Sequence, residues 1–274
     1  MVEFLPLCED AARQAGDVLR AYAGRIRWRE KGRHDLVTEA DIAAQERIFA
    51  VLRAAHPDHD LLGEEDLSAA KTAGAASSSP FRWVVDPLDG TTNYVHGLPY
   101  YSVSIALEHQ GEIVCGVVYD PTADECFAAA RGAGATLNGE KLQTSDCESL
   151  EAAMIAASFA ANVPRGSAEV TRFIEVLHRC QALRRMGSAA LNLCYVGCGR
   201  FDGYWATSVQ RWDIAAGMLI ALEAGGVITS LEGTPLDLAE PKIVATATPK
   251  LQAQLLKTLK TGTELAKMDP AQEK

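Results

Sequence analysis

The sequence predicts a mixed fold class, with an α+β arrangement in the first half of the chain and an α/β alternation in the second. Three observations support this prediction: amphipathic helical patterns open the chain, β-rich runs separated by turn residues follow, and strand-like and helical segments then alternate. The chain has 274 residues, of which 48% are hydrophobic and 23% charged. It is long enough to bury a large core, either as one big domain or as two closely joined lobes.

Two amphipathic helices are predicted at the start of the chain. Apolar residues recur at helical spacing from Leu5 to Tyr22 and again from about Glu39 to Ala55. Thr38 stands just before the second helix, where a threonine hydroxyl can cap free N–H groups. The segment from Arg29 to Asp41 is polar, charged and contains Gly32, so we expect an exposed turn or a mobile hairpin there.

The middle of the chain is rich in predicted strands. "HDLLGEED", from His59 to Asp66, predicts a short strand that ends in acids. Residues 67–80 are rich in small residues and lack apolar periodicity, which indicates a surface loop insertion. From Tyr100 to Leu142, β-rich runs alternate with turns and predict an antiparallel meander. The turn dipeptides are Gln110-Gly111, Asp120-Pro121 and Asn138-Gly139.

A second lobe is predicted from about Thr144 onward. "AAMIAAS" predicts a strand, and the later segments "FDGYWA", "GGVITS" and "KIVATA" are also strand-like. Helical patterns alternate with them, at Val170–Arg179, Ala189–Cys198 and Asp213–Ala224. We therefore expect an N-terminal lobe, residues 1–143, and a C-terminal lobe, residues 144–274, that together form one catalytic unit.

Charge and composition narrow the function classes. The net charge of −10 and the pI near 5.1 argue against a broad surface for nucleic acid or anionic membrane, because those partners favour clustered Lys and Arg. The chain has no run of about 18 apolar residues and no signal-peptide pattern at its start, so a cytoplasmic location is expected. The seven cysteines are odd in number and scattered, which favours reduced thiols over a disulfide framework.

A cluster of acids and glycine breaks the strand-like stretch "WVVDPLDGTTNYVHG", from Trp83 to Gly97. Asp86 and Asp89 leave an apolar run, and the following N–H groups can open a helix whose start favours an anion. Oxygen-only ligands suit hard cations such as Mg²⁺, and Asp86 could bridge two of them. The alternative is that Asp-Pro and Asp-Gly simply make turns.

Other acids stand at the ends of predicted elements, beside buried sequence. These acids are Asp41, the pair Glu64-Glu65, and Asp213. An unpaired charge is costly in such places, so a shared metal cluster accounts for all of them together. Hydrolysis of a phosphomonoester dianion needs a nucleophile near neutral pH and neutralising charge, and two ions about 4 Å apart supply both.

Six stretches together resemble the motifs of the inositol monophosphatase family, in the same order and with similar spacing. They run from Asp35 to Gly226 and read "DLVTEAD", "LLGEED", "WVVDPLDGTTNYVHGLPYYSVSIAL", "GVVYDP", "GSAALNLCYVGCGRFDGYW" and "WDIAAGMLIALEAGG". The resemblance implies a layered αβαβα sandwich of the inositol monophosphatase and fructose-1,6-bisphosphatase type. It also implies hydrolysis of a phosphomonoester by Mg²⁺-activated water, without a phosphoenzyme.

The resemblance also implies roles for individual residues. Two Mg²⁺ ions and a third, weaker one near Glu64 would be held by Glu64, Asp86, the Leu88 carbonyl, Asp89 and Asp213, with Asp86 shared between the first two. Asp41 and Thr91, beside Glu64, would orient and deprotonate the attacking water. The substrate would be bound by Asp89, Gly90, Thr91, Gly187, Ser188, Ala189 and Asp213, with the Gly90 and Thr91 N–H groups receiving the phosphate. Lys31 lies where the family places a lysine that helps close the site, and a solvated lysine is the equal alternative.

Two residues bear on the choice of substrate. Ala206 stands seven residues before Asp213, where inositol-preferring relatives commonly carry a glutamate that accepts hydrogen bonds from ring hydroxyls. Alanine offers no acceptor, so we expect a weaker preference for inositol phosphates. Arg211 could meet a second phosphate or a carboxylate on the substrate, or could simply be solvated.

These expectations lead to a Mg²⁺-dependent phosphatase of small sugar or polyol phosphates, nominally of inositol-1-phosphate. The alternative substrates in the family are fructose-1,6-bisphosphate, histidinol phosphate, NADP and 3′-phosphoadenosine 5′-phosphate. An alternative function of another class is that of an interaction protein in RNA-polymerase or ribosome assembly. The expected partners are a small phosphomonoester and, by resemblance, a second copy of the chain in a homodimer, whereas neither membrane nor nucleic acid is expected.

Overall fold

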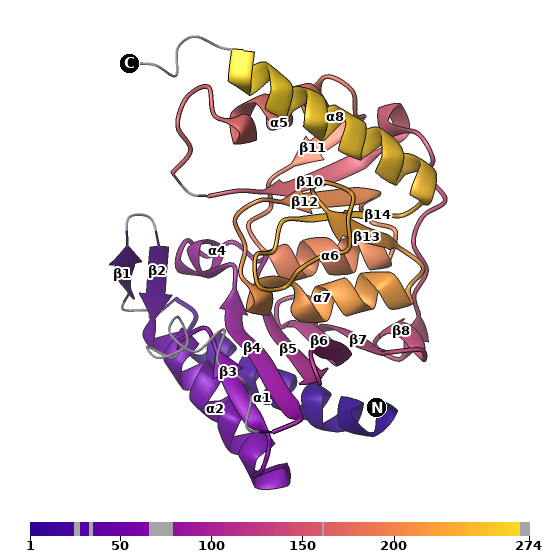
Figure 1. Cartoon of the computed structure of the whole chain (residues 1–274). Helices are drawn as coiled ribbons and strands as arrows, with labels where there is room; N and C mark the ends of the chain where they lie inside the picture. Colours follow the sequence, from indigo (N-terminus) through magenta and orange to yellow (C-terminus); the bar gives the residue numbers. More distant parts are fainter. Residues whose placement is uncertain (25–27, 33–34, 66–78, 161, 269–274) are drawn as a thin grey trace.

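Five layers make up the fold in a computed structural model that describes residues 1–24, 28–32, 35–65, 79–160 and 162–268, with the backbone alone described for 28–32 and 35–37. Figure 1 shows helices α1 (Leu5–Tyr22) and α2 (Glu39–Ala55) on the outer face of a large sheet. Helices α6 (Ala189–Gly197) and α7 (Arg211–Glu223) lie between this sheet and a smaller one. Helices α5 (Ala168–Leu177) and α8 (Pro249–Met268) cover the far face. The predicted αβαβα sandwich is confirmed.

The large sheet has seven strands in simple sequence order. They are β3 (Asp60–Gly63), β4 (Phe81–Asp89), β5 (Ser102–His109), β6 (Glu112–Asp120), β7 (Glu125–Ala130), β8 (Gly134–Leu137) and β9 (Glu140–Lys141). Only β3 and β4 run parallel, so the predicted antiparallel meander is confirmed. Gln110 and Gly111 both have positive φ, as do Asn138 and Gly139. Two consecutive residues with positive φ form a turn whose backbone twist matches that of the two strands it joins.

The small sheet has five strands and mixes both directions. Its order is β11 (Ala182–Arg184), β10 (Met154–Ser158), β12 (Gly203–Ala206), β14 (Ile243–Thr246) and β13 (Val227–Ser230). Strand β10 is parallel to both neighbours, whereas β14 is antiparallel to both of its own. The predicted alternation of strands and helices is present, and the antiparallel pairing of β14 adds a mixed character to the sheet. The large sheet ends before residue 142 and the small one begins after residue 153, on either side of the expected lobe boundary.

Most of the predicted helices agree closely with the structure. Helices α1 and α2 have the expected bounds, and Thr38 caps α2 in a capping box with Asp41. The segment before α2 forms an antiparallel hairpin of β1 (Trp28–Gly32) and β2 (Asp35–Thr38). The short helical segments are η1 (Val2–Phe4), α4 (Thr91–Val95) and η2 (Leu150–Ala152). The loop insertion predicted for residues 67–80 falls mostly outside the described residues.

Three apolar cores join the layers. Leu19 and Trp83 belong to the core between α1, α2 and the large sheet. Ile220 belongs to the core between the two sheets, around α6 and α7. Trp205 and Leu255 belong to the core under α5 and α8. Both faces of the central strands are therefore buried, which explains their nearly continuous apolar runs.

Small residues bring α7 close to the large sheet. A Cβ at Gly116 of β6 would lie 2.9 Å from the Cα of Ala216 in α7, closer than such atoms approach. A glycine is therefore needed at this crossing. Ser104 of β5 also donates a hydrogen bond of 3.3 Å to the Trp212 carbonyl at the start of the helix. These contacts fix the position of Asp213 against β4 and β5.

In the described residues, none of the helices combines the length and the apolar character that a membrane crossing needs. All seven cysteines are free, as the sequence predicted, and four of them are buried.

Candidate active site

A β-bulge places Asp86 and Asp89 on the same side of β4. Asp86 pairs with Ser104 and Asp89 with Ser102, so three steps along β4 face two steps along β5. In a regular strand, side chains three apart point to opposite faces, and one extra residue cancels this difference. Pro87 lies inside the bulge, where its missing N–H group does not break the ladder. Both carboxylates are nearly buried, at 2% and 8% exposure.

Gly90 turns the chain from β4 into helix α4. Its φ of 97° lies in the left-handed region, and a Cβ there would sit 3.1 Å from the carbonyl oxygen of Tyr100. Only glycine meets both conditions without strain. The next residue, Thr91, has its hydroxyl 3.1 Å from the Leu88 carbonyl oxygen and 3.3 Å from Oδ1 of Asp41. One hydroxyl hydrogen serves both acceptors, so Thr91 links the bulge to helix α2.

Asp41 caps helix α2 with its carboxylate, and burial disfavours the ionised form of that carboxylate. Its Oδ2 accepts hydrogen bonds from the N–H and the hydroxyl of Thr38, which closes the capping box of α2. The side chain is fully buried, and burial raises the pKa of Asp41 to about 6 despite the Thr38 bonds. The charge of Glu64 acts in the same direction. Asp41 is therefore a carboxylate that can exchange a proton near neutral pH.

Glu64 stands where β3 ends and faces Asp86. Its N–H group donates to the Val85 carbonyl at 3.1 Å, which holds it beside β4. Burial raises the pKa of Asp86 well above the usual range, and the charges of Glu64, Asp89 and Asp213 raise it further. A hydrogen bond with the Glu64 side chain contributes in the same direction. The two carboxylates therefore lie close enough to share a proton or a cation.

Asp89 is held by the start of helix α6. Its carboxylate accepts hydrogen bonds from the Ser188 hydroxyl at 2.5 Å, from the Ala189 N–H at 3.2 Å and from the Ala190 N–H at 2.7 Å. Burial raises the pKa of Asp89 to about 6, while these bonds lower it. In this arrangement, Ser188 and Ala189 contact Asp89, so they position a predicted metal ligand.

Asp213 lies in the first turn of α7 and is partly accessible. Its Oδ2 accepts a hydrogen bond of 2.7 Å from the Gln210 N–H, again in a capping box. Burial raises the pKa of Asp213 well above its usual range, and the charges of Asp89 and Glu64 add to the effect. Asp41 and Asp213 thus each stand in the first turn of a helix, Asp41 within the influence of Glu64 and Asp213 within that of Glu64 and Asp89.

The side chains and carbonyl proposed as ligands have the chemistry that Mg²⁺ prefers. The donors are all oxygens, and the raised pKa values of Asp86 and Asp213 record a repulsion that a cation would relieve. In the part of the chain that the structure describes, no group of three or more His, Cys, Asp or Glu side chains is placed to hold one ion together. Both oxygens of Asp89 are engaged at α6. Mg²⁺ commonly takes only one or two carboxylates and keeps its waters, so the chemistry fits.

The residues singled out for specificity lie in different surroundings. Ala206 ends β12 and is fully buried. Arg211 donates a hydrogen bond of 3.0 Å to Glu108, and its side chain is only 16% exposed, so it is not the solvated arginine that the sequence allowed. Lys31 lies in β1, and its side chain is outside the described residues. Gly187 has a φ of 93° and precedes α6 directly.

One positioning residue was missed from the sequence. Asn93 of α4 donates through Nδ2 to the carbonyls of Tyr100 at 2.7 Å and Met186 at 2.8 Å. A Cβ at Gly187 would lie 2.9 Å from this nitrogen, so the two segments pack closely. Asn93 therefore clamps the helix carrying Thr91 to the loop before α6. Its place in "GTTNYVHG" gave no signal, because its partners are 93 residues away or in an irregular turn.

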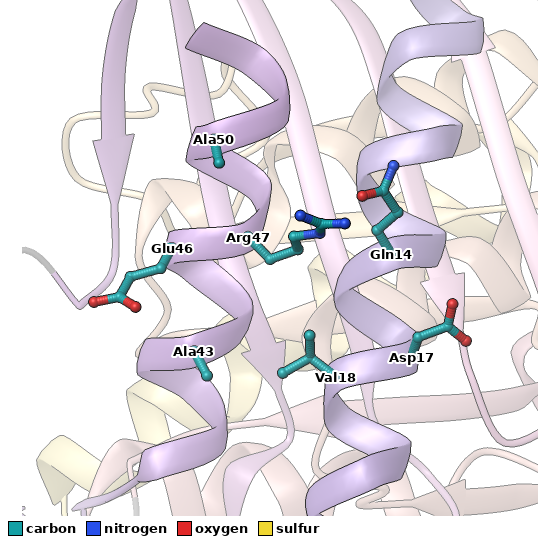
Figure 2. A pocket seen from close by; sticks show the side chains of 7 residues that line it. All are labelled: Gln14, Asp17, Val18, Ala43, Glu46, Arg47 and Ala50. Carbon is teal, nitrogen blue, oxygen red and sulfur yellow. The ribbon is translucent and has the colours of Figure 1, made fainter. Parts of the chain in front are cut away.

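A groove of about 540 Å³ lies apart from these acids, between α1 and α2 (Figure 2). Gln14, Asp17, Val18, Ala43, Glu46, Arg47 and Ala50 line it. The figure shows Arg47 extending from α2 toward Gln14 of α1. The groove lies on the outer helical layer and contains none of the residues described above.

Comparison with known proteins is consistent across sequence and structure. A model of the inositol monophosphatase family matches residues 2–264. The Nus factor SuhB of Pseudomonas aeruginosa is 38% identical over 261 residues, which cover 93% of this chain and 95% of the relative. Inositol monophosphatase 2 of Solanum lycopersicum is 40% identical over 250 residues, covering 90% and 94%.

Solved structures agree with these matches. The extragenic suppressor protein suhB from Bartonella henselae has a TM-score of 0.86 at 38% identity, covering 94% of this chain and 98% of that one. The inositol monophosphatase from Anabaena has a TM-score of 0.82 at 35% identity, covering 94% and 96%.

Proposed function

Because the chain belongs to the inositol monophosphatase family, whose members are generally metal-dependent phosphatases, we propose that it hydrolyses small sugar and polyol phosphates with Mg²⁺. Inositol-1-phosphate is the nominal substrate. The observation that carries the proposal is the gathering of Glu64, Asp86 and Asp213 around β4, where the charges of Glu64 and Asp213 raise the pKa of Asp86 and the charge of Glu64 raises the pKa of Asp213. Such a cluster is costly unless a cation binds it.

Glu64, Asp86 and the Leu88 carbonyl would hold one ion, and Asp86, Asp89 and Asp213 a second. When bound, Mg²⁺ supplies positive charge that lowers the pKa of water and neutralises the charge developing on the phosphate and the leaving oxygen. A third, weaker ion near Glu64 is part of the same proposal. The protein's own contribution is to hold these oxygens on one bulged strand and two helix ends.

Thr91 and Asp41 are placed to handle the proton of the attacking water. The Thr91 hydroxyl hydrogen points to Leu88 or Asp41, which leaves its oxygen lone pairs for a water hydrogen. A pKa of about 6 keeps Asp41 largely ionised near neutral pH, so it can accept the proton through Thr91. The water oxygen bonds to phosphorus, the ester P–O bond breaks, and the leaving alkoxide takes up a proton.

The phosphate would be received at the turn after β4. Gly90 has a left-handed backbone at this turn, directly after Asp89, and the N–H groups of Gly90 and Thr91 would contact phosphate oxygens. Ser188 and Ala189 act indirectly in this proposal, because their donors already bind Asp89. Gly187 supplies the turn that brings them there.

An interaction role is the competing hypothesis. Relatives named Nus factor SuhB are 36–40% identical, and those named inositol monophosphatase are similarly close, so identity does not separate the two. The acid cluster favours catalysis, because a binding surface alone gives no reason to bury mutually repelling carboxylates. The expected homodimer stays a prediction.

Phosphate release from a substrate panel tests the proposal. The panel contains inositol-1-phosphate, fructose-1,6-bisphosphate, 3′-phosphoadenosine 5′-phosphate, histidinol phosphate, NADP and glycerol-2-phosphate, each with Mg²⁺ and with excess chelator. We expect turnover only with Mg²⁺. Because Ala206 offers no acceptor for a ring hydroxyl, we expect no preference of several orders of magnitude for inositol-1-phosphate. Full activity in chelator, or none on any substrate, would contradict the proposal.

A further inference from the structure

A second anion-binding group must be sought away from Arg211. That arginine pairs with Glu108, and both side chains are at most 16% exposed. Its charge is therefore paired within the protein, and Nη2 is directed to Glu108 on β5, whereas the buried Nε makes no hydrogen bond to the described residues. This observation removes the residue that the sequence placed nearest to Asp213 as a binder of a second phosphate.

Arg185 is the better candidate by its contacts. It follows strand β11 directly, and its guanidinium lies 4.3 Å from the centre of the Phe159 ring. Its Nη2 donates to the Phe159 carbonyl at 2.9 Å. The group is thus held in place by a cation–π contact and a main-chain acceptor, while Nε and Nη1 make no hydrogen bond to the described residues.

The charge of Arg185 is not balanced by an acid. Seven other arginines lie within 4.0 Å of a carboxylate oxygen: Arg13, Arg20, Arg131, Arg172, Arg179, Arg200 and Arg211. No such partner is present in the described ranges for Arg185, nor for Arg47, Arg53, Arg165 and Arg184, although the chain carries a net charge of −10. Burial lowers its pKa, and no carboxylate contributes to raise it. Arg185 is exposed, so its guanidinium is accessible to an anionic ligand.

Chain neighbours of Arg185 contact residues of the proposed reaction site. The neighbouring residue, Met186, offers its carbonyl to Asn93 in the helix that carries Thr91. Three residues after Arg185, the Ser188 hydroxyl binds Asp89. The short segment from Arg185 to Ser188 therefore connects this free cation to both α4 and a predicted metal ligand.

We propose that Arg185 binds a second phosphate group of the substrate, so that small bisphosphates are preferred to the matching monophosphates. This inference rests on the proposed phosphatase activity and specifies its substrate class. The planar guanidinium presents N–H groups that match phosphate oxygens, and the adjacent exposed Arg184 adds positive charge. The fully buried Ala206 adds no competing acceptor for a ring hydroxyl.

The experiment compares substrates that differ only in the second phosphate. The pairs are fructose-1,6-bisphosphate with fructose-1-phosphate, and 3′-phosphoadenosine 5′-phosphate with adenosine 3′-phosphate, each measured with Mg²⁺. In the natural protein we expect a lower KM for the bisphosphate of at least one pair. In Arg185→Gln we expect that KM to rise about tenfold, with kcat and the monophosphate kinetics nearly unchanged. Arg185→Lys should keep part of the preference.

Arg53→Gln is the matched control. Arg53 also stacks on a phenylalanine, with its guanidinium 5.3 Å from the Phe49 ring centre, but it lies at the end of α2 in the outer layer. We expect no change in KM from this variant. If Arg185→Gln leaves the bisphosphate KM unchanged while monophosphates are still hydrolysed, the inference is wrong and the proposed activity stands. If no monoester is hydrolysed at all, the proposed activity itself fails.

Discussion

Asp86 is the residue on which the proposed chemistry depends most. It lies in the bulge of β4, is 2% exposed, and faces Glu64, Asp89 and Asp213, all of which raise its pKa. A neutral amide in its place would remove repulsion from the metal-free fold, yet it would weaken both proposed ion sites. Stability and activity should therefore move in different directions.

We predict that Asp86→Asn lowers phosphatase activity by about three orders of magnitude, because several kcal/mol of charge stabilisation are lost. The midpoint of thermal unfolding without metal should stay the same or rise. Asp10→Asn, at an exposed position on α1, serves as the control and should change neither quantity. Substantial turnover by Asp86→Asn would rule out a bridging role.

His59 gives the protein a separate sensitivity to acid. Its ring stacks on His56 with centroids 4.5 Å apart and on Phe81 at 4.7 Å. Burial lowers the pKa of His59, and the charge of His56 lowers it further, while Asp58 opposes them. A lowered pKa means that the folded state binds its proton less readily than the unfolded chain does.

Stability from His59 should accordingly be present above about pH 6.5 and should be lost as the pH falls through the lower folded pKa. The free energy of unfolding should decrease from pH 7.5 to pH 5 in the natural protein. We predict that this decrease is smaller in His59→Phe, with a difference of less than about 1 kcal/mol. Urea unfolding at both pH values measures this. His178→Gln, at an exposed position after α5, should behave like the natural protein, and an equal pH dependence in all three proteins would refute the assignment.

Helix α4 depends on the glycine that precedes it, Gly90. Gly90 and Gly97 stand before and after this helix, and both have positive φ. Among the described residues, none beyond the two chain neighbours of Gly97 comes within 4 Å of an added Cβ, whereas at Gly90 the Tyr100 carbonyl oxygen would be 3.1 Å away. Alanine substitutions at Gly90 and Gly97 therefore distinguish the cost of a strained backbone from the cost of a steric contact.

We predict that Gly90→Ala lowers the free energy of unfolding by about 2–3 kcal/mol and that Gly97→Ala lowers it by about 1 kcal/mol. Both substitutions incur the left-handed strain, but only the first also pushes against Tyr100. Activity should fall further in Gly90→Ala, because Thr91 follows directly. Equal losses of stability in the two variants would show that the contact with Tyr100 contributes nothing.

Some helices and strands could be predicted from the sequence, and others could not. Helices α1 and α2 were predicted with the correct bounds because their apolar spacing is local. Helix α8 was not predicted, although Leu251, Leu255 and Leu259 have helical spacing, so there the signal was present but unused. Strand β11 has only three residues, too few for periodicity to indicate it.

The acids of the candidate active site could be predicted from the sequence, but their arrangement in space could not. These acids stood out in sequence because charges at the ends of apolar segments are unusual. The bulge that turns Asp86 and Asp89 to one side depends on the pairing with β5, which no local pattern reports. The partner of Arg211, Glu108, lies 103 residues away, so its role could not be read from the neighbouring sequence. The assignment of the metal ligands itself stays a prediction.

For the whole molecule, ion binding and folding should be coupled. The acids come from β3, β4, α2 and α7, so a cation that relieves their repulsion binds the folded state and not the unfolded chain. We predict that Mg²⁺ at about 100 times its dissociation constant raises the unfolding midpoint by about 5 °C or more, from about 2.7 kcal/mol of stabilisation. NaCl at equal ionic strength should not do so, and neither should Mg²⁺ with Asp86→Asn. A shift of the same size in that variant would place the ion elsewhere.

The order of these segments along the chain has a consequence for synthesis on the ribosome. The seven-stranded sheet is complete at Lys141, but α6 and α7, which cover its inner face, come 48 or more residues later, from Ala189 onward. A nascent chain of this intermediate length therefore exposes the apolar inner face of a finished sheet, and it lacks Asp213 for the proposed second ion. Folding from the N-terminus thus reaches a stage that is vulnerable to aggregation and cannot yet hold its full set of metal ligands. Once helix α7 has been translated, the inner face of the sheet can be covered and Asp213 is present.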